Sequence, residues 1–188
     1  TIKLFFVSVK DYRMSIDHSQ ELQNGTSPSN KIMVLFGSET GTAEEYAFDL
    51  GSALQAEGYA CEVSDLDDYE ASALVTEHLA IIVSSTYGNG EAPYNAEDLY
   101  NWLETQEPDP SSLSFAVCAL GDSGYPSFAQ AGKDFDRLLG ENGANRILER
   151  TELDACFDEQ VEPFIEKVQA WLVLHGQCYK KTVNLNPV

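Results

Sequence analysis

Residues 32–46 read I-M-V-L-F-G-S-E-T-G-T-A-E-E-Y, an apolar run that passes through a short loop into a helical pattern. The run I-M-V-L is typical of a buried β-strand, and apolar residues recur at helical spacing over residues 43–57. The loop carries the hydroxyls of Ser38, Thr40 and Thr42 and precedes a helix N-terminus, whose free N–H groups attract phosphate. The stretch therefore predicts a strand, a phosphate-binding loop and a helix, without the lysine of a nucleotide-hydrolysis loop.

The same loop also permits a purely structural interpretation. Thr42 followed three residues later by Glu45 matches the capping box, in which each side chain bonds the backbone N–H of the other residue. The residues of this loop alone do not decide between a helix cap and a phosphate site.

The rest of the chain repeats the alternation of short β-rich runs and longer amphipathic segments. The run H-L-A-I-I-V-S at 78–84 is almost wholly apolar, as expected of a central strand covered on both faces. We therefore predict an α/β fold with a doubly wound, five-stranded parallel sheet and helices on both faces, for which the order 2-1-3-4-5 is one of the two common solutions. The expected strands are residues 31–37, 59–63, 78–84, 114–120 and 144–150, and the expected helices are 43–57, 71–76, 95–105, 128–142 and 159–174.

The length of 188 residues suits one domain with a substantial core. We predict this domain over residues 31–175, after a flexible N-terminal segment or linker at 1–30 that contains Q-N-G-T-S-P-S-N. Residues 176–188 are expected to form a polar connector. The longest apolar runs are far below the roughly 20 residues that span a bilayer, so we expect no membrane span in this chain.

The charge balance is strongly acidic, with 11 Lys and Arg against 31 Asp and Glu and a formal net charge of −20. Residues 32–132 contain no Lys or Arg at all. Such a surface repels nucleic acid and anionic lipid and attracts a basic protein partner. Solubility is the alternative explanation of this composition.

The four cysteines lie far apart in the chain and have no metal-ligand spacing, so we expect neither a metal site nor disulfides. Cys118 falls inside the run S-F-A-V-C-A-L, which predicts a buried cysteine on a strand. A reducing, cytoplasmic location fits this usage best. The other three cysteines are Cys61, Cys156 and Cys178.

Two further glycine-rich loops follow the third and fourth predicted strands. They read S-S-T-Y-G-N-G-E-A-P-Y-N-A at 84–96 and L-G-D-S-G-Y-P-S-F at 120–128. Ligands of doubly wound sheets bind outside the carboxyl ends of the strands, where these loops and the first one emerge together. Because each of the two loops carries an aromatic residue, Tyr87 and Tyr125, a planar aromatic ligand is the favoured interpretation.

The three loops together carry a family resemblance. The segments G-S-E-T-G-T-A-E-E, S-T-Y-G-N-G-E-A-P-Y-N-A and A-L-G-D-S-G-Y-P-S-F-A-Q-A-G-K-D-F-D resemble, in order and spacing, the flavin mononucleotide (FMN) loops of diflavin reductases. That family includes the sulfite reductase flavoprotein, the reductase of haem-thiolate monooxygenases and the reductase region of nitric oxide synthase. The resemblance covers residues 31–174 and implies a flavodoxin-like fold.

The resemblance also assigns roles by position. Residues 38–43 would bind the FMN phosphate, and residues 85–90 and 120–129 would hold the isoalloxazine ring and ribityl chain, with Tyr87 and Tyr125 on the two ring faces. No catalytic base or nucleophile is expected, because the cofactor performs the chemistry. The implied cofactor-binding residues are Ser38, Glu39, Thr40, Gly41, Thr42, Ala43, Ser85, Thr86, Tyr87, Gly88, Asn89, Gly90, Leu120, Gly121, Asp122, Ser123, Gly124, Tyr125, Pro126, Ser127, Phe128, Ala129 and Asp154.

The tail Y-K-K-T-V-N-L-N-P-V resembles the connector to the FAD and NADPH domain of such reductases. The resemblance thus implies the FMN module of an NADPH-dependent diflavin oxidoreductase. It would accept electrons from an FAD/NADPH module and pass them one at a time to a haem or iron–sulfur protein. Carboxylates around the flavin predict a strongly reducing cofactor, because like charge opposes reduction to an anion.

Three alternatives remain open at this stage. The first is a free-standing flavodoxin carrier, and the second is an FMN-dependent enzyme that reduces quinones by two electrons. The third is a flavin-free signalling or interaction domain. A receiver domain needs an acidic residue at the end of the third strand, where this chain has Ser84 and Ser85.

Overall fold

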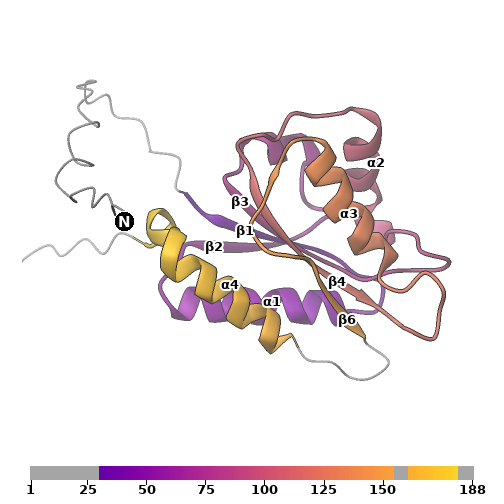
Figure 1. Cartoon of the computed structure of the whole chain (residues 1–188), viewed down its shortest axis with the longest axis horizontal. Helices are drawn as coiled ribbons and strands as arrows, with labels where there is room; N and C mark the ends of the chain where they lie inside the picture. The colour runs from indigo at the N-terminus through magenta and orange to yellow at the C-terminus, as the bar shows by residue number, and fades with distance from the viewer. Residues whose placement is uncertain (1–29, 155–160, 182–188) are drawn as a thin grey trace, which may run out of the picture.

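The computed structural model describes residues 30–154 and 161–181, which form a parallel sheet between two layers of helices (Figure 1). The strand order is β2-β1-β3-β4-β5, and β6 also pairs with β4. The predicted doubly wound α/β fold and its strand order are confirmed. The strands and helices are β1 (Ile32–Gly37), α1 (Thr42–Ala56), β2 (Cys61–Asp65), β3 (Leu79–Ser84), α2 (Glu97–Thr105), β4 (Ser114–Gly121), α3 (Gln130–Glu141), β5 (Asn145–Arg146), β6 (Thr151–Asp154) and α4 (Glu162–His175), with short 3₁₀ helices at Ala71–Thr76, Tyr94–Ala96 and Gly176–Tyr179.

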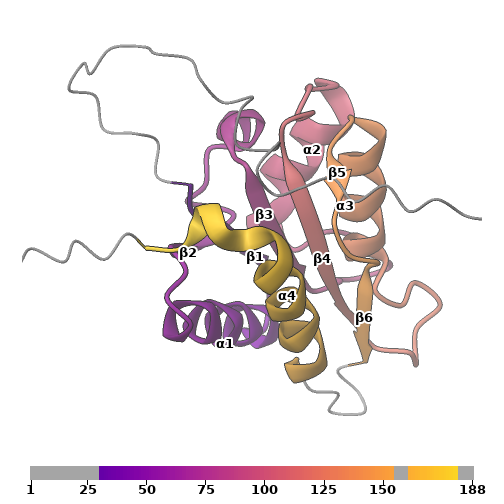
Figure 2. The same ribbon diagram turned by 60° about the vertical axis from the view of Figure 1, so that its left-hand side comes forward.

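Helices α1 and α4 cover one face of the sheet, and α2 and α3 cover the other (Figures 1 and 2). Alternate side chains of β1 enter the two cores: Val34 packs with the α1 and α4 residues, and Leu35 with those of α2 and α3. All residues of β1 and β3 are buried. This two-sided burial explains why their sequences are apolar throughout rather than alternating.

The carboxyl ends of β1, β3 and β4 lie level with one another. Gly37 pairs with Ser84, and Ser84 pairs with Ala119. Gly37 must be a glycine, because a Cβ there would lie 2.7 Å from the Cβ of Ala96. Strands β2 and β3 lie on opposite sides of β1, so the strand order reverses at β1. The loops after β1, β3 and β4 therefore emerge at the same edge of the sheet, beside this switch point.

The expected fifth strand at 144–150 is wrong in detail. The chain pairs with β4 first through β5 and then through β6, and residues 147–150 between them are not paired as a strand. Phe115 pairs with Arg146, and Cys118 pairs with Thr151. Between these two pairs, residues 116–117 of β4 lie opposite residues 147–150 of the edge. The edge strand therefore contains a two-residue bulge, a feature frequent at sheet edges and beside functional sites.

The bounds of all four α-helices differ from expectation by one to three residues, and the starts of α3 and α4 have a local cause. Helix α3 begins at Gln130 rather than residue 128, because Ala129 takes the left-handed conformation (φ 54°) and forms the N-cap. Helix α4 begins at Glu162 with Pro163 in its first turn, where a missing N–H costs nothing. The expected residues 159–160 of that helix, residues 1–29, Cys156 and residues 182–188 lie outside the described part of the chain.

The first residues of the expected connector pack against the domain. Tyr179 is buried, and its carbonyl accepts a hydrogen bond from Ala60 N (2.7 Å). Lys181 N donates to Gly58 O (2.9 Å), so the chain follows the segment before β2 as far as residue 181. Within residues 30–154 and 161–181, no helix combines the length and apolar character needed to cross a membrane.

Candidate cofactor-binding site

The first loop turns directly into the N-terminus of α1. Gly41 is the N-cap, with a left-handed φ of 94°, and its N–H donates to Ser38 Oγ (3.0 Å). Thr42 is the first helical residue, and no side chain caps the helix, so the capping-box interpretation is wrong. Because Gly41 is the N-cap, Thr42 does not occupy the position from which a side-chain oxygen could accept a hydrogen bond from the N–H of Glu45.

The loop keeps its hydroxyl groups available. Among the residues that the structure describes, the hydroxyls of Thr40 and Thr42 have no hydrogen-bond partner. A Cβ at Gly41 would meet no atom within 4 Å, so its left-handed backbone, rather than crowding, favours glycine there. The hydroxyls and the free N–H groups of the first turn of α1 together form a site that can accept an anion.

Two residues that the sequence analysis missed hold this loop in place. Ser38 N donates to Asn95 Oδ1 (2.9 Å), and Asn95 Nδ2 donates to Asp65 Oδ1 (2.8 Å) at the end of β2. Tyr94 N donates to Glu39 Oε1 (2.7 Å). These bonds join residues that are 30 to 57 positions apart, so no local pattern predicts them. The only signal in the sequence was that Tyr94 and Asn95 belong to the second motif.

The second loop forms a tight hairpin. Tyr87 and Glu91 exchange backbone hydrogen bonds of 3.0 and 2.9 Å, and Asn89 N donates to the Glu91 carboxylate. Gly88 and Gly90 have positive φ values, which glycine adopts without strain. The hairpin presents Tyr87 at the surface, where 58% of this residue is exposed.

The third loop is closed at its base. A Cβ at Gly121 would lie 2.9 Å from the Cα of Ala129, so the two ends of the loop touch. Asp122 stabilises the turn through two hydrogen bonds. Its backbone carbonyl accepts one from Tyr125 N (3.1 Å), and its carboxylate accepts the other from Gly124 N (2.7 Å). Tyr125 stands at the tip and is 64% exposed.

Asp154 supports this loop from the sheet. It is buried at the end of β6, and its Oδ1 accepts a hydrogen bond from Ser123 N (3.3 Å). The structure therefore brings Asp154 to the third loop, as a residue that contacts the loop backbone.

A cavity of about 380 Å³ lies between the second and third loops. This volume falls within the usual range for small-molecule sites. Thr86 on its wall accepts a hydrogen bond from Ala131 N (3.2 Å), which leaves the Thr86 hydroxyl proton free to donate into the cavity. The lining residues are Thr86, Tyr87, Gly88, Asp122, Tyr125 and Ser127.

Some of the expected cofactor-binding residues point away from this cavity. Ala43, Leu120 and Ala129 are buried in the cores, and Phe128 packs against the core formed with α2 and α3. Only backbone atoms of the three buried residues can reach a ligand.

Carboxylates lie on the cavity wall, at Asp122, and in a hollow beside it. This hollow of about 600 Å³ is lined by Glu39, Glu91 and Glu97, together with Tyr87 and the exposed Tyr94. Among the described residues, no Lys or Arg lines either space. A negative potential at the site follows from this arrangement.

The chain matches a known protein family over most of its length. The family model described as Flavodoxin matches residues 34–171. The chain belongs to the flavodoxin family. Flavodoxins bind FMN, so this flavodoxin domain is an FMN-binding flavoprotein of the electron-transport oxidoreductases.

Solved flavodoxins share its fold. A cysteine-to-serine mutant of flavodoxin from Pseudomonas aeruginosa superimposes with a TM-score of 0.66 at 32% identity, over 76% of this chain and 99% of that one. Oxidised flavodoxin 1 from Bacillus cereus matches with a TM-score of 0.65 at 27% identity, over 77% of this chain and 98% of that one.

Similar curated proteins are flavoprotein alpha-components of NADPH sulfite reductase. That of Vibrio parahaemolyticus is 42% identical over 136 residues, and that of Aliivibrio fischeri is 40% identical over 157 residues. The matches cover 72% and 81% of this chain but only 22% and 26% of the relatives. The flavodoxin domain thus spans about a quarter of the length of these relatives.

Proposed function

We propose that this flavodoxin domain transfers electrons one at a time, from an FAD/NADPH module to a haem or iron–sulfur acceptor protein. The observation that carries the proposal is the cavity between Tyr87 and Tyr125, which is open at the surface and adjoins a hollow lined by three glutamates. The similarity to alpha-components named for NADPH sulfite reductase supports the source of the electrons.

The residues present fit FMN. The phosphate would lie at the N-terminus of α1, bound by the hydroxyls of Thr40 and Thr42 and by free backbone N–H groups. The isoalloxazine ring would lie in the 380 Å³ cavity between Tyr87 and Tyr125, where the Thr86 hydroxyl can donate to it. When bound, FMN supplies the redox chemistry, because it can take up and release electrons singly.

The protein contributes the electrostatic environment of the flavin. The carboxylates of Glu39, Glu91 and Glu97 oppose additional negative charge nearby, and no cation of the described residues lines the site to offset them. We therefore expect the fully reduced cofactor to be a strong reductant. The phosphate loop has no lysine, which also keeps positive charge away from the flavin. The loop needs no lysine for catalysis, because the phosphate of FMN only anchors the cofactor and is not transferred.

The same carboxylates define the partner. They surround the exposed Tyr87 and Tyr94 at the rim of the site, so a basic surface would approach where the ring comes closest to solvent. We propose a basic haem or iron–sulfur protein as acceptor. A cytoplasmic location is part of this proposal and rests on the cysteine usage of the sequence.

Stepwise reduction of the purified chain, followed by its visible spectrum, tests the proposal. We expect one FMN per chain and two resolved one-electron steps, the second at a low potential. A chain that binds no FMN would overturn the proposal. A single two-electron step would favour the quinone-reductase alternative instead.

One observation favours a free-standing carrier as the second candidate. The flavodoxin of Pseudomonas aeruginosa is covered over 99% of its length, so this domain contains the fold of a complete carrier. An immunoblot of the source cells distinguishes the candidates. A band near 20.7 kDa would indicate the carrier, and a much larger band would indicate a module of a longer reductase.

A further inference from the structure

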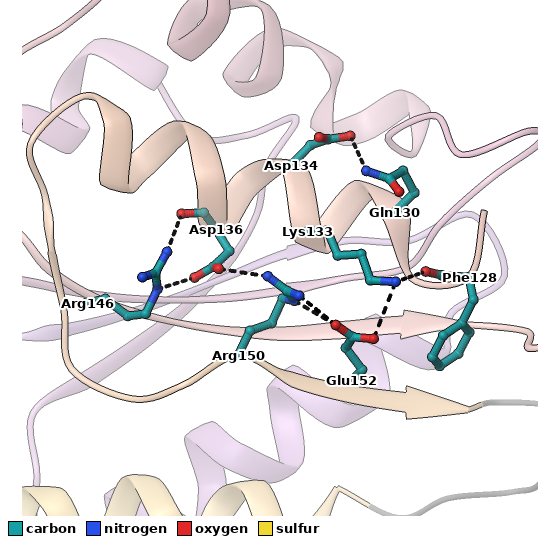
Figure 3. Close-up of polar contacts among 8 residues, drawn as sticks. All are labelled: Phe128, Gln130, Lys133, Asp134, Asp136, Arg146, Arg150 and Glu152. Carbon is teal, nitrogen blue, oxygen red and sulfur yellow. Dashed lines mark hydrogen bonds and ion pairs between the residues drawn. The ribbon is translucent and has the colours of Figure 1, made fainter.

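Three of the first four basic residues after the lysine-free region, Lys133, Arg146 and Arg150, form a chain of ion pairs between α3 and the edge of the sheet (Figure 3). At one end, the buried carboxylate of Asp136 accepts Arg146 Nε (2.6 Å) and Arg150 Nη1 (2.8 Å). Asp136 is only 6% exposed, and the two arginines offset the burial of its charge. Arg146 is the last residue of β5, and Arg150 is the last residue of the bulge before β6.

The chain of ion pairs continues toward the third loop. Arg150 donates twice to Glu152 Oε1, from Nε (3.0 Å) and Nη2 (2.6 Å). The other oxygen of Glu152 lies 3.4 Å from Lys133 Nζ. Lys133 Nζ donates in turn to the backbone carbonyl of Phe128 (2.6 Å) and lies 5.3 Å from the centroid of its ring (Figure 3).

We propose that Lys133 is a positioning residue for the flavin ring, because its ammonium holds the end of the loop that carries Tyr125. The proposal rests on the FMN site described above and adds a residue outside the cavity to it. Lys133 acts on the Phe128 carbonyl, and Glu152 keeps the ammonium in that position.

The backbone of the loop needs such a tether. Ala129, directly after Phe128, has a left-handed φ of 54°, which a residue other than glycine keeps only where its surroundings hold it. Asp154 and Asp122 fix the first half of the loop through Ser123 and Gly124. Lys133 provides the corresponding bond for the second half, next to the α3 cap.

The ion pair with Glu152 also reduces the positive charge that Lys133 brings near the loop. Partial burial would raise the pKa of Glu152, but hydrogen bonding and charge from Arg150, together with Lys133, lower it below its usual value. Glu152 is therefore ionised at neutral pH and shares its negative charge between Arg150 and the Lys133 ammonium. The carboxylate thus offsets part of the charge of the cation that holds the loop.

The test compares Lys133→Met with Lys133→Arg, which keeps the charge, and with the control Arg137→Met. Arg137 is on the same helix but pairs only with the side chains of Asp134 and Glu141 among the described residues, away from the loop. FMN affinity is measured by flavin fluorescence on apoprotein, together with the two reduction potentials. We expect about tenfold weaker binding for Lys133→Met, equivalent to about 1.4 kcal/mol. Lys133→Arg should recover most of this loss, and Arg137→Met should bind FMN within twofold of native.

A double-mutant cycle with Tyr125→Ala separates positioning from general stability. If Lys133 acts through the loop, Lys133→Met should cost much less affinity in the Tyr125→Ala background than in the native one. Equal costs in the two backgrounds would overturn the proposal, as would unchanged FMN affinity in Lys133→Met. If Lys133→Met does not fold, Glu152→Gln serves in its place, because it loosens the ammonium without removing it.

FMN binding to the native chain is measured first, so that a failure of the proposed function can be distinguished from a failure of the role proposed for Lys133. A native chain that binds no FMN contradicts the proposed function. A native chain that binds FMN as tightly as its Lys133→Met variant contradicts only the role of Lys133.

Discussion

Asn95 joins two of the three loops through one side-chain amide. Its oxygen accepts Ser38 N in the phosphate loop, and its nitrogen donates to Asp65 at the end of β2. An amide carries its acceptor oxygen and its donor nitrogen on separate atoms, so one short side chain can bridge two partners. The geometry of the phosphate loop therefore depends on a residue that belongs to another motif.

The hydroxyls of the phosphate loop lead to a first prediction. The double variant Thr40→Ala/Thr42→Ala should release FMN, because it removes two donors to the phosphate dianion. Each lost charge-assisted hydrogen bond costs about 1.5 to 3 kcal/mol, so the loss of two should lower the affinity by at least about 100-fold. Dissociation constants for FMN and for riboflavin, which has no phosphate, are measured in parallel.

The comparison with riboflavin makes this prediction specific. The variant should lose its preference for FMN over riboflavin, while riboflavin affinity stays nearly constant. Ser52→Ala, at an exposed position of α1, is the matched control and should keep the native preference. Full FMN retention in the double variant would show that the phosphate binds elsewhere.

Single residues of the site were predictable where they are neighbours in sequence. The hydroxyls at 38–42 and the two loop tyrosines stand in short motifs next to glycines, and the structure places both tyrosines on one cavity. Four supporting residues were missed: Tyr94, Asn95, Asp65 and Lys133. Their partners lie far away in sequence or are backbone atoms, and no local pattern identifies such a bond.

At the scale of elements, α3 packs closely on the sheet through a glycine. A Cβ at Gly132 would lie 2.7 Å from the Cα of Ala119 on β4. The helix can therefore approach β4 only because no side chain stands between them. The resulting contact holds Lys133 and the start of α3 beside the third loop.

Two glycines of α3 give opposite predictions. Gly132→Ala should destabilise the fold by about 1 to 3 kcal/mol, because the added methyl must push the helix away from β4. Gly140→Ala should stabilise it by up to about 1 kcal/mol, since its Cβ would meet only the end of the flexible Arg146 side chain, at 3.4 Å. Urea unfolding of both variants measures the difference. Equal stabilities would contradict the close packing at Gly132.

Most elements followed from sequence periodicity, and the edge strand did not. The 3₁₀ helix at Ala71–Thr76 has the expected bounds, and β1, β3 and β4 differ from expectation by one residue at most. Strand β2 begins and ends two residues later than expected. The run A-N-R-I-L-E-R has the composition of a continuous strand, but the chain bulges at 147–150. Ion pairs of Arg146 and Arg150 with Asp136 accompany the bulge, and such tertiary contacts leave no periodic signal.

At the scale of the whole molecule, the charge is distributed unevenly. The net charge is −20, and the four basic residues between residues 133 and 150 are all paired with carboxylates. The acidic rim around the flavin site therefore faces solvent without a compensating cation from that group.

This distribution predicts a salt-dependent electron transfer. The rate of reduction of a basic haem protein by the reduced FMN-loaded chain should fall as ionic strength rises, since the Debye length shrinks from about 10 Å at 0.1 M to about 3 Å at 1 M. A small neutral acceptor serves as control and should show little dependence. Stopped-flow absorbance measures both rates, and equal salt dependence would contradict electrostatic docking.

The sequence by itself determined the fold class, because burial on both faces of a parallel sheet imposes apolar runs on the strands. The strand order followed from the resemblance that the three loop motifs carry. The sequence also determined the acidic character of the surface, which depends only on composition. Only the tertiary structure decided which hydrogen bonds and ion pairs hold those loops, and where the edge strand bulges. Those contacts join residues that are distant in the chain, and they form only after the sheet and its helices have packed.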